Sequence, residues 1–273
     1  MNTAIEIFAP GYLTPANYRE SVTTLEEYLL SLPQVEMQVK QHFLPGVYTR
    51  ELLIPKGVVL TGCVHKEECV TIISKGEILI ATQDGGQRLI AGDSFVTPKG
   101  IKRVGLAVED TLCVTVHKYN GLPLDEDTMK QVIGCDTYAI YDEYLAVLEL
   151  EKDYQDYQLL KKELGMSEED IQKFVNLDNV DMNFDCGVYL GESKLHGTGV
   201  FAKEAFLEYE DISPAMVGDK RTVLGRFTNH SVNPNSSPKG DMLIATRYIQ
   251  QDEEITVNYR NMLAERSQLC QVA

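Results

Sequence analysis

Arg226-Phe227-Thr228-Asn229-His230-Ser231-Val232-Asn233-Pro234-Asn235 is the stretch that decides the fold of the carboxyl-terminal part of this chain. Beyond it, a polar turn and two predicted strands lead to Glu253-Glu254-Ile255-Thr256-Val257-Asn258-Tyr259-Arg260. The Asn-His pair lies in a short turn, before an alternating strand that ends on a tyrosine. An Asn-His pair is an unusual choice for a turn in front of such a strand.

A glycine-containing segment precedes this stretch: Ser193-Lys194-Leu195-His196-Gly197-Thr198-Gly199-Val200-Phe201-Ala202. Glycines let a loop bring its backbone N–H groups close to a ligand, although a tight hairpin explains them equally well. A predicted strand and an acidic turn follow, not a helix. This order excludes a dinucleotide-binding fingerprint.

Taken together, the three segments closely resemble the SET domain of protein-lysine methyltransferases, over roughly residues 184–262. The resemblance implies a pocket for S-adenosylmethionine, with Asn229 and His230 holding its amino-acid end and Arg226 and Phe227 leading a strand into that turn. The residues that it implies for cofactor binding are Gly197, Thr198, Gly199, Arg226, Phe227, Asn229 and His230.

The same resemblance makes Tyr259 the catalytic tyrosine beside a lysine channel. Ser231, Pro234 and Asn235 would shape a crossing in which the last segment is threaded under a loop. Methyl transfer from a sulfonium requires positioning and electrostatics more than a metal or a covalent intermediate. A tyrosine hydroxyl and inward-pointing carbonyls are sufficient for that task. Glu253 and Glu254 are interpreted as turn carboxylates.

The sequence departs from the family pattern at several positions. Val232 stands where the family usually has cysteine, and only Cys270 follows Tyr259, so a structural zinc site of that type is not expected. We expect residues 261–263 or a partner subunit to close the lysine channel. The span between Gly199 and Arg226 is short, as in the small SET proteins of bacteria and viruses.

Residues 41–118 show a different pattern. Short β-rich runs alternate with Gly, Pro and Asp turns, which predicts a sandwich or small barrel. The spacing of glycines, proline and polar residues resembles the two motifs of the cupin family, a jelly-roll barrel. The residues that carry this resemblance are Gly57, Cys63, His65, Cys69 and Gly76, then Gly92, Pro98, Gly100 and Arg103.

The cupin family usually places metal ligands at four of these positions, and here they are Cys63, His65, Cys69 and Arg103. Two thiolates and an imidazole with an open fourth position suit catalytic zinc. Arg103, however, has no lone pair to donate, so it would repel a cation or bind an anion. Buried cysteine is also a common apolar filler. We favour a degenerate structural or small-anion cupin over zinc at Cys63, His65 and Cys69.

The predicted fold is mainly β with a helical connector: a cupin jelly-roll barrel and a SET-domain β fold with a threaded carboxyl-terminal segment. Residues 121–185 hold 17 acidic and 5 basic residues and carry helical periodicity. The predicted divisions are an arm with a short helix (1–40), the barrel (41–118), the acidic helical connector (119–183) and the SET domain (184–273).

The net charge of −16 over 273 residues argues against nucleic-acid binding. It is compatible with a basic protein substrate, but solubility is the simpler explanation. We expect no membrane span and no secretory signal. Six scattered cysteines favour reduced thiols in a cytoplasm. The resemblance to a cupin barrel beside a short SET domain implies a bacterial or phage-infected cell.

The predicted function is S-adenosylmethionine-dependent methylation of a lysine in a protein substrate, with the cupin-like domain as a dimerisation or recognition module of a homodimer. One alternative is a non-catalytic binding protein on a retired SET scaffold. The other is a zinc-binding cupin enzyme.

Overall fold

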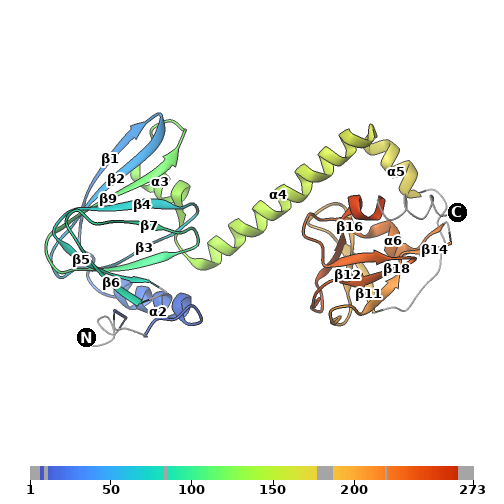
Figure 1. Cartoon of the computed structure of the whole chain (residues 1–273), viewed down its shortest axis with the longest axis horizontal. Helices are drawn as coiled ribbons and strands as arrows, with labels where there is room; N and C mark the ends of the chain where they lie inside the picture. The colour runs from blue at the N-terminus through green and yellow to red at the C-terminus, as the bar shows by residue number, and fades with distance from the viewer. Residues whose placement is uncertain (1–6, 9–11, 83–84, 177–186, 219, 264–273) are drawn as a thin grey trace. The chain divides into compact units, whose positions relative to one another are not determined.

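The computed structural model describes residues 7–8, 12–82, 85–176, 187–218 and 220–263. Contacts divide the chain into two compact units, residues 1–145 and 146–273 (Figure 1). The finer division made from the sequence stays a prediction. The elements of the first unit are α2 (Tyr18–Leu30), β1 (Gln38–Leu44), β2 (Gly46–Ile54), β3 (Val59–His65), β4 (Cys69–Lys75), β5 (Glu77–Thr82), β6 (Gly85–Ile90), β7 (Ser94–Thr97), β8 (Lys102–Ala107), β9 (Thr111–Tyr119), α3 (Glu126–Ile133) and β10 (Gly134–Cys135).

The first unit is a jelly roll of two facing sheets. Their strand orders are β1-β2-β9-β4-β7 and β10-β3-β8-β5-β6. Along the chain, β2 to β5 and then β7 to β9 alternate between the two sheets, which is the connectivity of a double-stranded β-helix. The predicted jelly roll is therefore confirmed, but the hydrogen bonds of the described strands form two open sheets, not a closed barrel.

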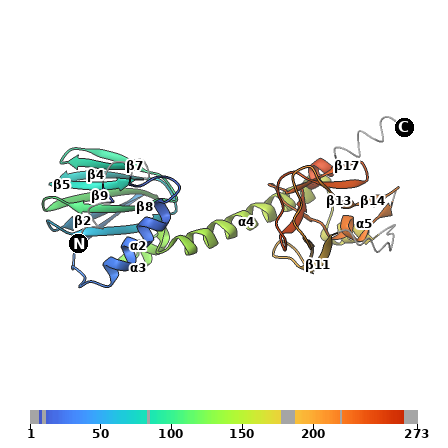
Figure 2. The same ribbon diagram turned by 90° about the horizontal axis from the view of Figure 1, so that it is seen from below.

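The core of the jelly roll follows from period-2 alternation along its strands. On β2, for example, Tyr48, Leu52 and Ile54 are buried while their neighbours are more exposed. α2 packs against β3 and β8 through Tyr18, Val22 and Leu25 (Figure 2). The buried residues between the sheets are Leu52, Ile54, Ile73, Ile78, Ile80, Ala107 and Cys113.

Thr24-Leu25-Glu26-Glu27 has the spacing of a capping box, which predicts a helix start at Thr24, but helix α2 begins earlier. Its first residue is Tyr18, and the N-cap residue Asn17 makes no side-chain cap. The amide oxygen of Asn17 instead accepts from the backbone N–H of Thr14 at 2.7 Å. Burial of Tyr18 against the sheet explains the earlier start, because packing outweighs capping preference.

The predicted helical connector forms three helices: α3, then α4 (Tyr138–Leu164) and α5 (Glu168–Asn176). A glycine after a helical run predicts a C-cap, and Gly165 ends α4 with φ +64°. Ser167-Glu168-Glu169-Asp170 has a capping-box pattern, which predicts a helix start. The reciprocal cap of α5 is formed, since Asp170 N–H donates to Ser167 Oγ at 3.1 Å and Ser167 N–H donates to Asp170 Oδ2 at 3.0 Å. None of the helices among the described residues is both long and apolar enough to cross a membrane.

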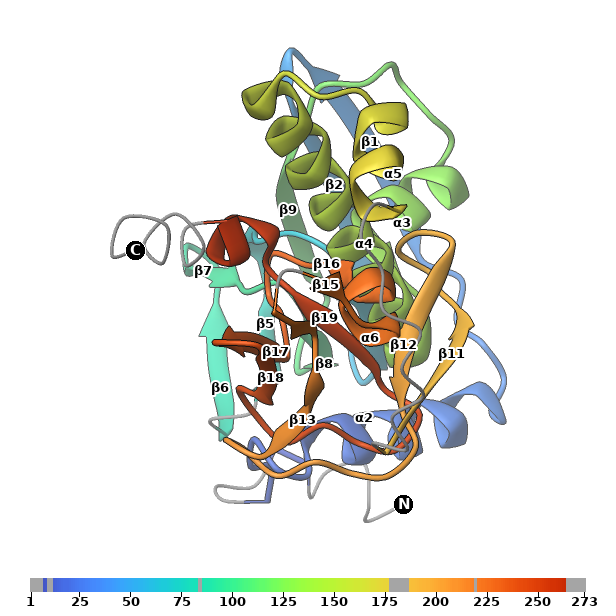
Figure 3. The ribbon, with the colours of Figure 1, turned by 90° about the vertical axis from the view of Figure 1, so that its right-hand side faces the viewer.

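The second unit is built from short strands around a threaded segment. Its sheet β11-β12-β19-β16 places β19 between β12 and β16, antiparallel to one and parallel to the other (Figure 3). Its elements besides α5 are β11 (Val188–Glu192), β12 (Thr198–Ala202), β13 (Asp211–Pro214), β14 (Met216–Val217), β15 (Lys220–Arg221), α6 (Val223–Phe227), β16 (Asn229–His230), β17 (Ser236–Lys239), β18 (Met242–Ala245) and β19 (Glu254–Val257).

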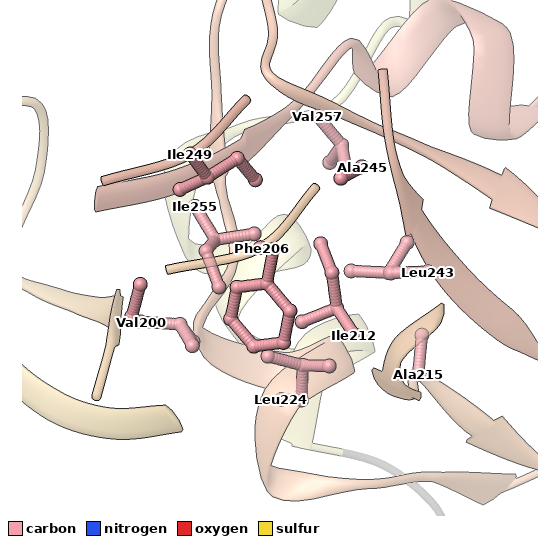
Figure 4. Packing of buried hydrophobic residues seen from close by; sticks show 11 residues of the cluster. Val200, Phe206, Ile212, Ala215, Leu224, Leu243, Ala245, Ile249, Ile255 and Val257 are labelled. Carbon is pink, nitrogen blue, oxygen red and sulfur yellow. The ribbon is translucent and has the colours of Figure 1, made fainter. Parts of the chain in front are cut away.

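Phe206 lies at the centre of the second unit's core, against side chains from several short strands (Figure 4). Tyr259 and Phe227 pack at the edge of the same cluster, so the core and the predicted site share a wall. The buried members are Val200, Ala202, Phe206, Ile212, Ala215, Leu224, Leu243, Ala245, Ile249, Ile255 and Val257.

Arg226 and Phe227 do not lead a strand into the Asn-His turn, as predicted, but end the short helix α6. Thr222 caps this helix by accepting from the N–H of Gly225 at 3.1 Å. Gly225 also packs so close to Ala215 that an added Cβ would lie 2.0 Å from the Ala215 carbonyl oxygen. This cap and this contact fix a helical turn where the resemblance implies a strand.

Candidate active site

A cavity of about 250 Å³ lies within the second unit and collects most of the predicted cofactor residues. Five separated segments contribute to it: helix α4, helix α5, the loop that leads into β12, the α6–β16 segment and the chain after β19. Gly199 is the one predicted cofactor residue that does not line it. The lining residues are Asp153, Tyr154, Tyr157, Ile171, Gln172, Leu195, His196, Gly197, Thr198, Arg226, Phe227, Asn229, His230 and Tyr259.

Gly199 has a packing role. A Cβ added there would lie 2.3 Å from Oε1 of Glu254 and 3.0 Å from the Cβ of Ser193. Glu254 accepts the hydroxyl of Ser193 at 2.8 Å, and Ser193 in turn accepts the N–H of Leu195 at 2.9 Å. Glu254 is therefore not a turn carboxylate but the strand residue that anchors the glycine loop.

Asn229 joins this loop to the parallel strand pair. Its amide nitrogen donates to the carbonyls of His196 and Thr198, at 3.1 and 3.2 Å, and to Glu254 Oε1 at 2.9 Å. Asn229 is buried, so these contacts stabilise the loop that lines the cavity. The predicted clamp is assembled, and the donors of its side chain are engaged by the protein itself.

The hydroxyl of Tyr259 donates to the carbonyl oxygen of Thr228 at 3.0 Å. Burial raises the pKa of Tyr259 to about 12. The phenol is therefore neutral near pH 7, a hydrogen-bond donor that retains oxygen lone pairs. The cavity thus presents a fixed hydroxyl where the sequence predicts the catalytic tyrosine.

His230 connects Tyr259 to helix α4. Its Nδ1 accepts the backbone N–H of Tyr259 at 3.2 Å, so its proton is on Nε2, which lies 3.0 Å from Oδ2 of Asp156. Burial lowers the pKa of His230, although Asp156 opposes that shift. Arg260 donates to the other oxygen of Asp156 at 3.2 Å. Burial alone would raise the pKa of Asp156, but hydrogen bonds from Arg260 and His230 leave it lowered.

A second carboxylate of α4 holds the turn after the Asn-His pair. Asp153 is buried and accepts the hydroxyl of Ser231 at 3.2 Å and the N–H of Val232 at 2.7 Å. Because Val232 takes part through its backbone, the missing cysteine of the family pattern does not disturb this contact. Helix α4 therefore fixes both sides of His230.

Asn235 fixes the threaded crossing. It is almost completely buried, and its Oδ1 accepts the N–H of Thr256 at 2.8 Å while its Nδ2 donates to the carbonyl of Glu254 at 2.8 Å. These two bonds imitate a strand pairing across β19. The predicted role of Asn235 in shaping the crossing thus has a direct structural basis.

Helices α4 and α5 supply the lining residues that motif matching misses. Tyr157 lies edge-on to Tyr259, with ring centroids 6.2 Å apart, and its hydroxyl bonds to Glu168 at 3.2 Å. The alternation of tyrosines along α4 predicts packing, and nothing local distinguishes a ring that faces a cavity. The sequence offers one local signal: Asp153 and Asp156, spaced i, i+3, place two carboxylates on one face of α4. Both bond to residues of the Asn-His turn.

The cavity residues fit S-adenosylmethionine in kind. Rings of Tyr154, Tyr157 and Phe227 suit an adenine, and Arg226 suits a carboxylate. The cavity is small beside the roughly 300–1,000 Å³ of ordinary ligand sites. Ile171 and Gln172 of α5 occupy one wall, so their side chains limit the available space.

In the first unit, three possible metal donors converge, and two of them, His65 and Cys69, belong to the predicted set. Atoms of His65, Cys69 and His117 all lie within 4.8 Å of one another. The register of β3 shifts between Thr61 and Val64, which breaks the expected alternation, and Cys63 packs against Gly134. Among the described residues Cys63 is therefore outside the group, and His117 on β9 replaces it.

The donor set of this group suits zinc, but its charge environment does not. Cys69 Sγ and His65 Nδ1 are 3.4 Å apart, and the buried Nε2 of His117 has no hydrogen-bond partner. Burial, and then the charge of Arg103, lower the pKa of His65 to about 3 and of His117 to about 4. A guanidinium that disfavours imidazolium disfavours a metal cation for the same reason.

Comparison with protein families gave one informative match: the model described as SET domain matches residues 56–260. The matched range begins within the jelly roll, before the predicted start at residue 184. A search of curated proteins gave no match.

Solved structures similar to this chain include KdgF from Halomonas sp. (21% identity, 35% of this chain and 88% of that chain, TM-score 0.30). A cupin-2 domain protein from Shewanella frigidimarina is 18% identical over 35% of this chain and 92% of its own, with TM-score 0.27. A cupin domain from Bordetella pertussis is 17% identical over 33% and 99%, with TM-score 0.28. These scores are low, and the jelly roll is identified by its strand order.

Proposed function

Because the chain belongs to the SET domain family, we propose that its second unit transfers a methyl group from S-adenosylmethionine to a lysine of a protein substrate. One observation carries the proposal. Gly197 and Thr198, the α6–β16 segment and Tyr259 are far apart in the sequence, yet they line one cavity.

The chain's own residues provide positioning and a fixed dipole. When bound, S-adenosylmethionine supplies an electrophilic methyl group, which the amine lone pair takes as the carbon–sulfur bond breaks and a neutral thioether leaves. Tyr259 donates to Thr228, and its oxygen lone pairs remain free to accept a hydrogen bond from the lysine amine. Asp156 and His230 hold the backbone of Tyr259 in place. Such preorganised contacts supply most of the acceleration in reactions of this kind.

A labelled-methyl assay tests this function. The full-length protein is incubated with S-adenosylmethionine carrying a labelled methyl group and a lysate of the source cell, and labelled proteins are mapped by mass spectrometry. Label on lysine side chains supports the proposal. Label that is absent, or that is equal in a reaction with heat-inactivated protein, contradicts it.

A non-catalytic SET scaffold is the second candidate, and two observations favour it. The cavity is small, and the side-chain N–H groups of Asn229 already donate to His196, Thr198 and Glu254, so they do not point to a ligand. Calorimetry with S-adenosylmethionine and its demethylated product separates the candidates. Saturable binding of both compounds supports the enzyme, and no heat at high micromolar ligand supports the scaffold.

A further inference from the structure

A cavity of about 1030 Å³ lies between the two sheets of the first unit. Ligand sites for small molecules measure roughly 300–1,000 Å³, so this volume accommodates an organic molecule. Both sheets contribute to the lining: β2, β4 and β9 from one, and β3, β5 and β8 from the other. Nothing in the proposed methyl transfer uses this cavity.

A belt of polar side chains crosses its middle. Arg50 pairs with Thr115, and Thr115 pairs with Thr71, so these three stand side by side on one sheet. Arg103 reaches across from the opposite sheet and donates to Thr71 Oγ1 at 2.7 Å. All four line the cavity. A guanidinium and threonine hydroxyls therefore meet in one ring.

One step along the strands the lining becomes apolar. Leu52 pairs with Cys113 in the row next to Arg50 and Thr115, and Ile54 follows on β2. Ile78 and Ile80 face them from β5. The cavity is thus amphipathic, with a cationic belt at mid-height and an aliphatic end.

Lys56 also lines this cavity but is exposed, and Lys130 pairs with Glu126. Arg103 differs in its partners from the other buried and half-buried cations. Arg50 pairs with Glu126, and Lys102 pairs with Glu26. Among the described residues no carboxylate bonds to Arg103, whose recorded contacts are Thr71 and the ring of Phe95. Burial lowers the pKa of Arg103. Burying a cation without an anion costs folding free energy. The chain has 41 Asp and Glu residues, so the absence of a carboxylate beside Arg103 is not explained by a shortage of acidic residues.

We propose that this cavity binds a small aliphatic monocarboxylate. Its carboxylate is held by Arg103 and the hydroxyl of Thr71, and its hydrocarbon tail lies against Leu52, Ile54 and Cys113. A planar guanidinium matches a carboxylate with two parallel hydrogen bonds. The one cation that is not exposed and has no carboxylate partner, Arg103, calls for one negative charge, and the apolar end calls for a tail. The inference does not depend on methyl transfer.

Calorimetry on the full-length protein tests the proposal with three probes: octanoate, 1-octanol and acetate. Octanoate has head and tail, and each of the others lacks one. Octanoate binds with one site per chain, and 1-octanol and acetate each bind about tenfold or more weakly, because a charge-assisted contact or a buried tail is lost. Octanoate that binds no better than 1-octanol, or not at all at about 10 mM, overturns the proposal.

Variants locate the site. Arg103→Gln weakens octanoate by about tenfold or more, and Arg88→Gln, which alters an exposed arginine paired with Glu77, leaves it unchanged. Cys113→Leu fills the apolar end and shifts the preference from octanoate toward hexanoate, a result that a misfolded variant does not give. Equal effects of Arg103→Gln and Arg88→Gln overturn the assignment of the anchor.

A metal control completes the experiment. Zinc on His65, Cys69 and His117 is the competing anchor for a carboxylate. Octanoate binding that survives a chelator, in protein whose elemental analysis shows no bound metal, supports Arg103. Binding that disappears on chelation and returns with zinc overturns the proposal.

Discussion

The hydroxyl of Tyr259 shows how burial assigns a chemical role to a residue. Its raised pKa, about 12, means that the phenol stays protonated throughout the neutral range. In the proposed methyl transfer it would therefore act as an orienting dipole and not as a base. The carbonyl of Thr228 determines the direction of that dipole.

Tyr259→Phe removes the dipole and little else. Methyl transfer is expected to fall by about 100-fold or more, as when one preorganised donor is lost, while the affinity for S-adenosylmethionine stays within about twofold. Initial rates and calorimetry measure the two effects. Tyr209→Phe alters an exposed tyrosine of the same unit and is the matched control. An unchanged rate for Tyr259→Phe removes the residue from the mechanism.

His230 predicts acid sensitivity. Its folded pKa is lower than the unfolded value of about 6.5, so the unfolded chain takes up a proton that the folded chain does not. Its contribution to stability is complete above about pH 6.5 and is lost as pH falls toward the folded value. Protonation of Nδ1 also breaks its bond with the N–H of Tyr259.

The measurement is the unfolding free energy between pH 7.5 and 5.5, both approximate limits. Wild-type protein loses stability with a slope of up to about 1.4 kcal/mol per pH unit for this histidine. His230→Gln is less stable at neutral pH, and its slope is shallower. His42→Gln, at a mostly exposed histidine paired with Glu51, keeps the wild-type slope. Parallel slopes for wild type and His230→Gln contradict the assignment.

At the scale of elements, α6 and β12 each depend on a close approach at glycine. An added Cβ at Gly225 meets the Ala215 carbonyl oxygen at 2.0 Å, and that oxygen already accepts the N–H of Thr222. At Gly199 the added Cβ meets the end of the Glu254 side chain at 2.3 Å. Backbone yields less readily than a side chain, so the two glycines differ in tolerance.

Gly225→Ala is therefore expected to destabilise the second unit by about 3 kcal/mol or more, and Gly199→Ala by about 1–3 kcal/mol. Gly240→Ala, at φ +62° in open space, costs roughly 1–2 kcal/mol from backbone strain alone. Urea unfolding of the three variants gives the order. A Gly225→Ala protein as stable as Gly240→Ala contradicts the packing argument.

The secondary-structure elements could be predicted from the sequence where the signal is local. The strands of the jelly roll follow alternation and turn residues, and the cap of α5 follows from Ser167 and Asp170. The α6 helix does not, because its cap and its glycine contact depend on Ala215, a residue of another segment. That His117 and not Cys63 lies in the group with His65 and Cys69 could not be predicted for a similar reason, since a register shift in β3 has no sequence marker.

The site as a whole divides in the same way. Gly197, Thr198, Asn229 and Tyr259 belong to contiguous motifs and were predictable. Asp156 bonds to a histidine 74 positions away, and His117 lies on a strand outside both spacing motifs. Contacts of this range are set by topology, which the sequence patterns did not specify to the residue.

The overall charge predicts substrate preference for the molecule. At −16, it attracts Lys/Arg-rich peptides and repels acidic ones. With matched acceptor peptides, the basic one is expected to have the lower KM, and its KM rises severalfold between about 0.05 and 0.3 M salt while kcat changes little. An uncharged acceptor peptide is the control. A KM that is independent of salt contradicts electrostatic attraction.

The central position of β19 also affects the order of events during synthesis. β12 and β16, its two neighbours in the sheet, leave the ribosome first, and the strand between them leaves last. At about 5–20 residues per second, the nascent second unit spends a few seconds with two unpaired strand edges facing an empty slot. Glu254 and Thr256, which bind Asn235, arrive with β19, so the site is assembled only after that strand has left the ribosome.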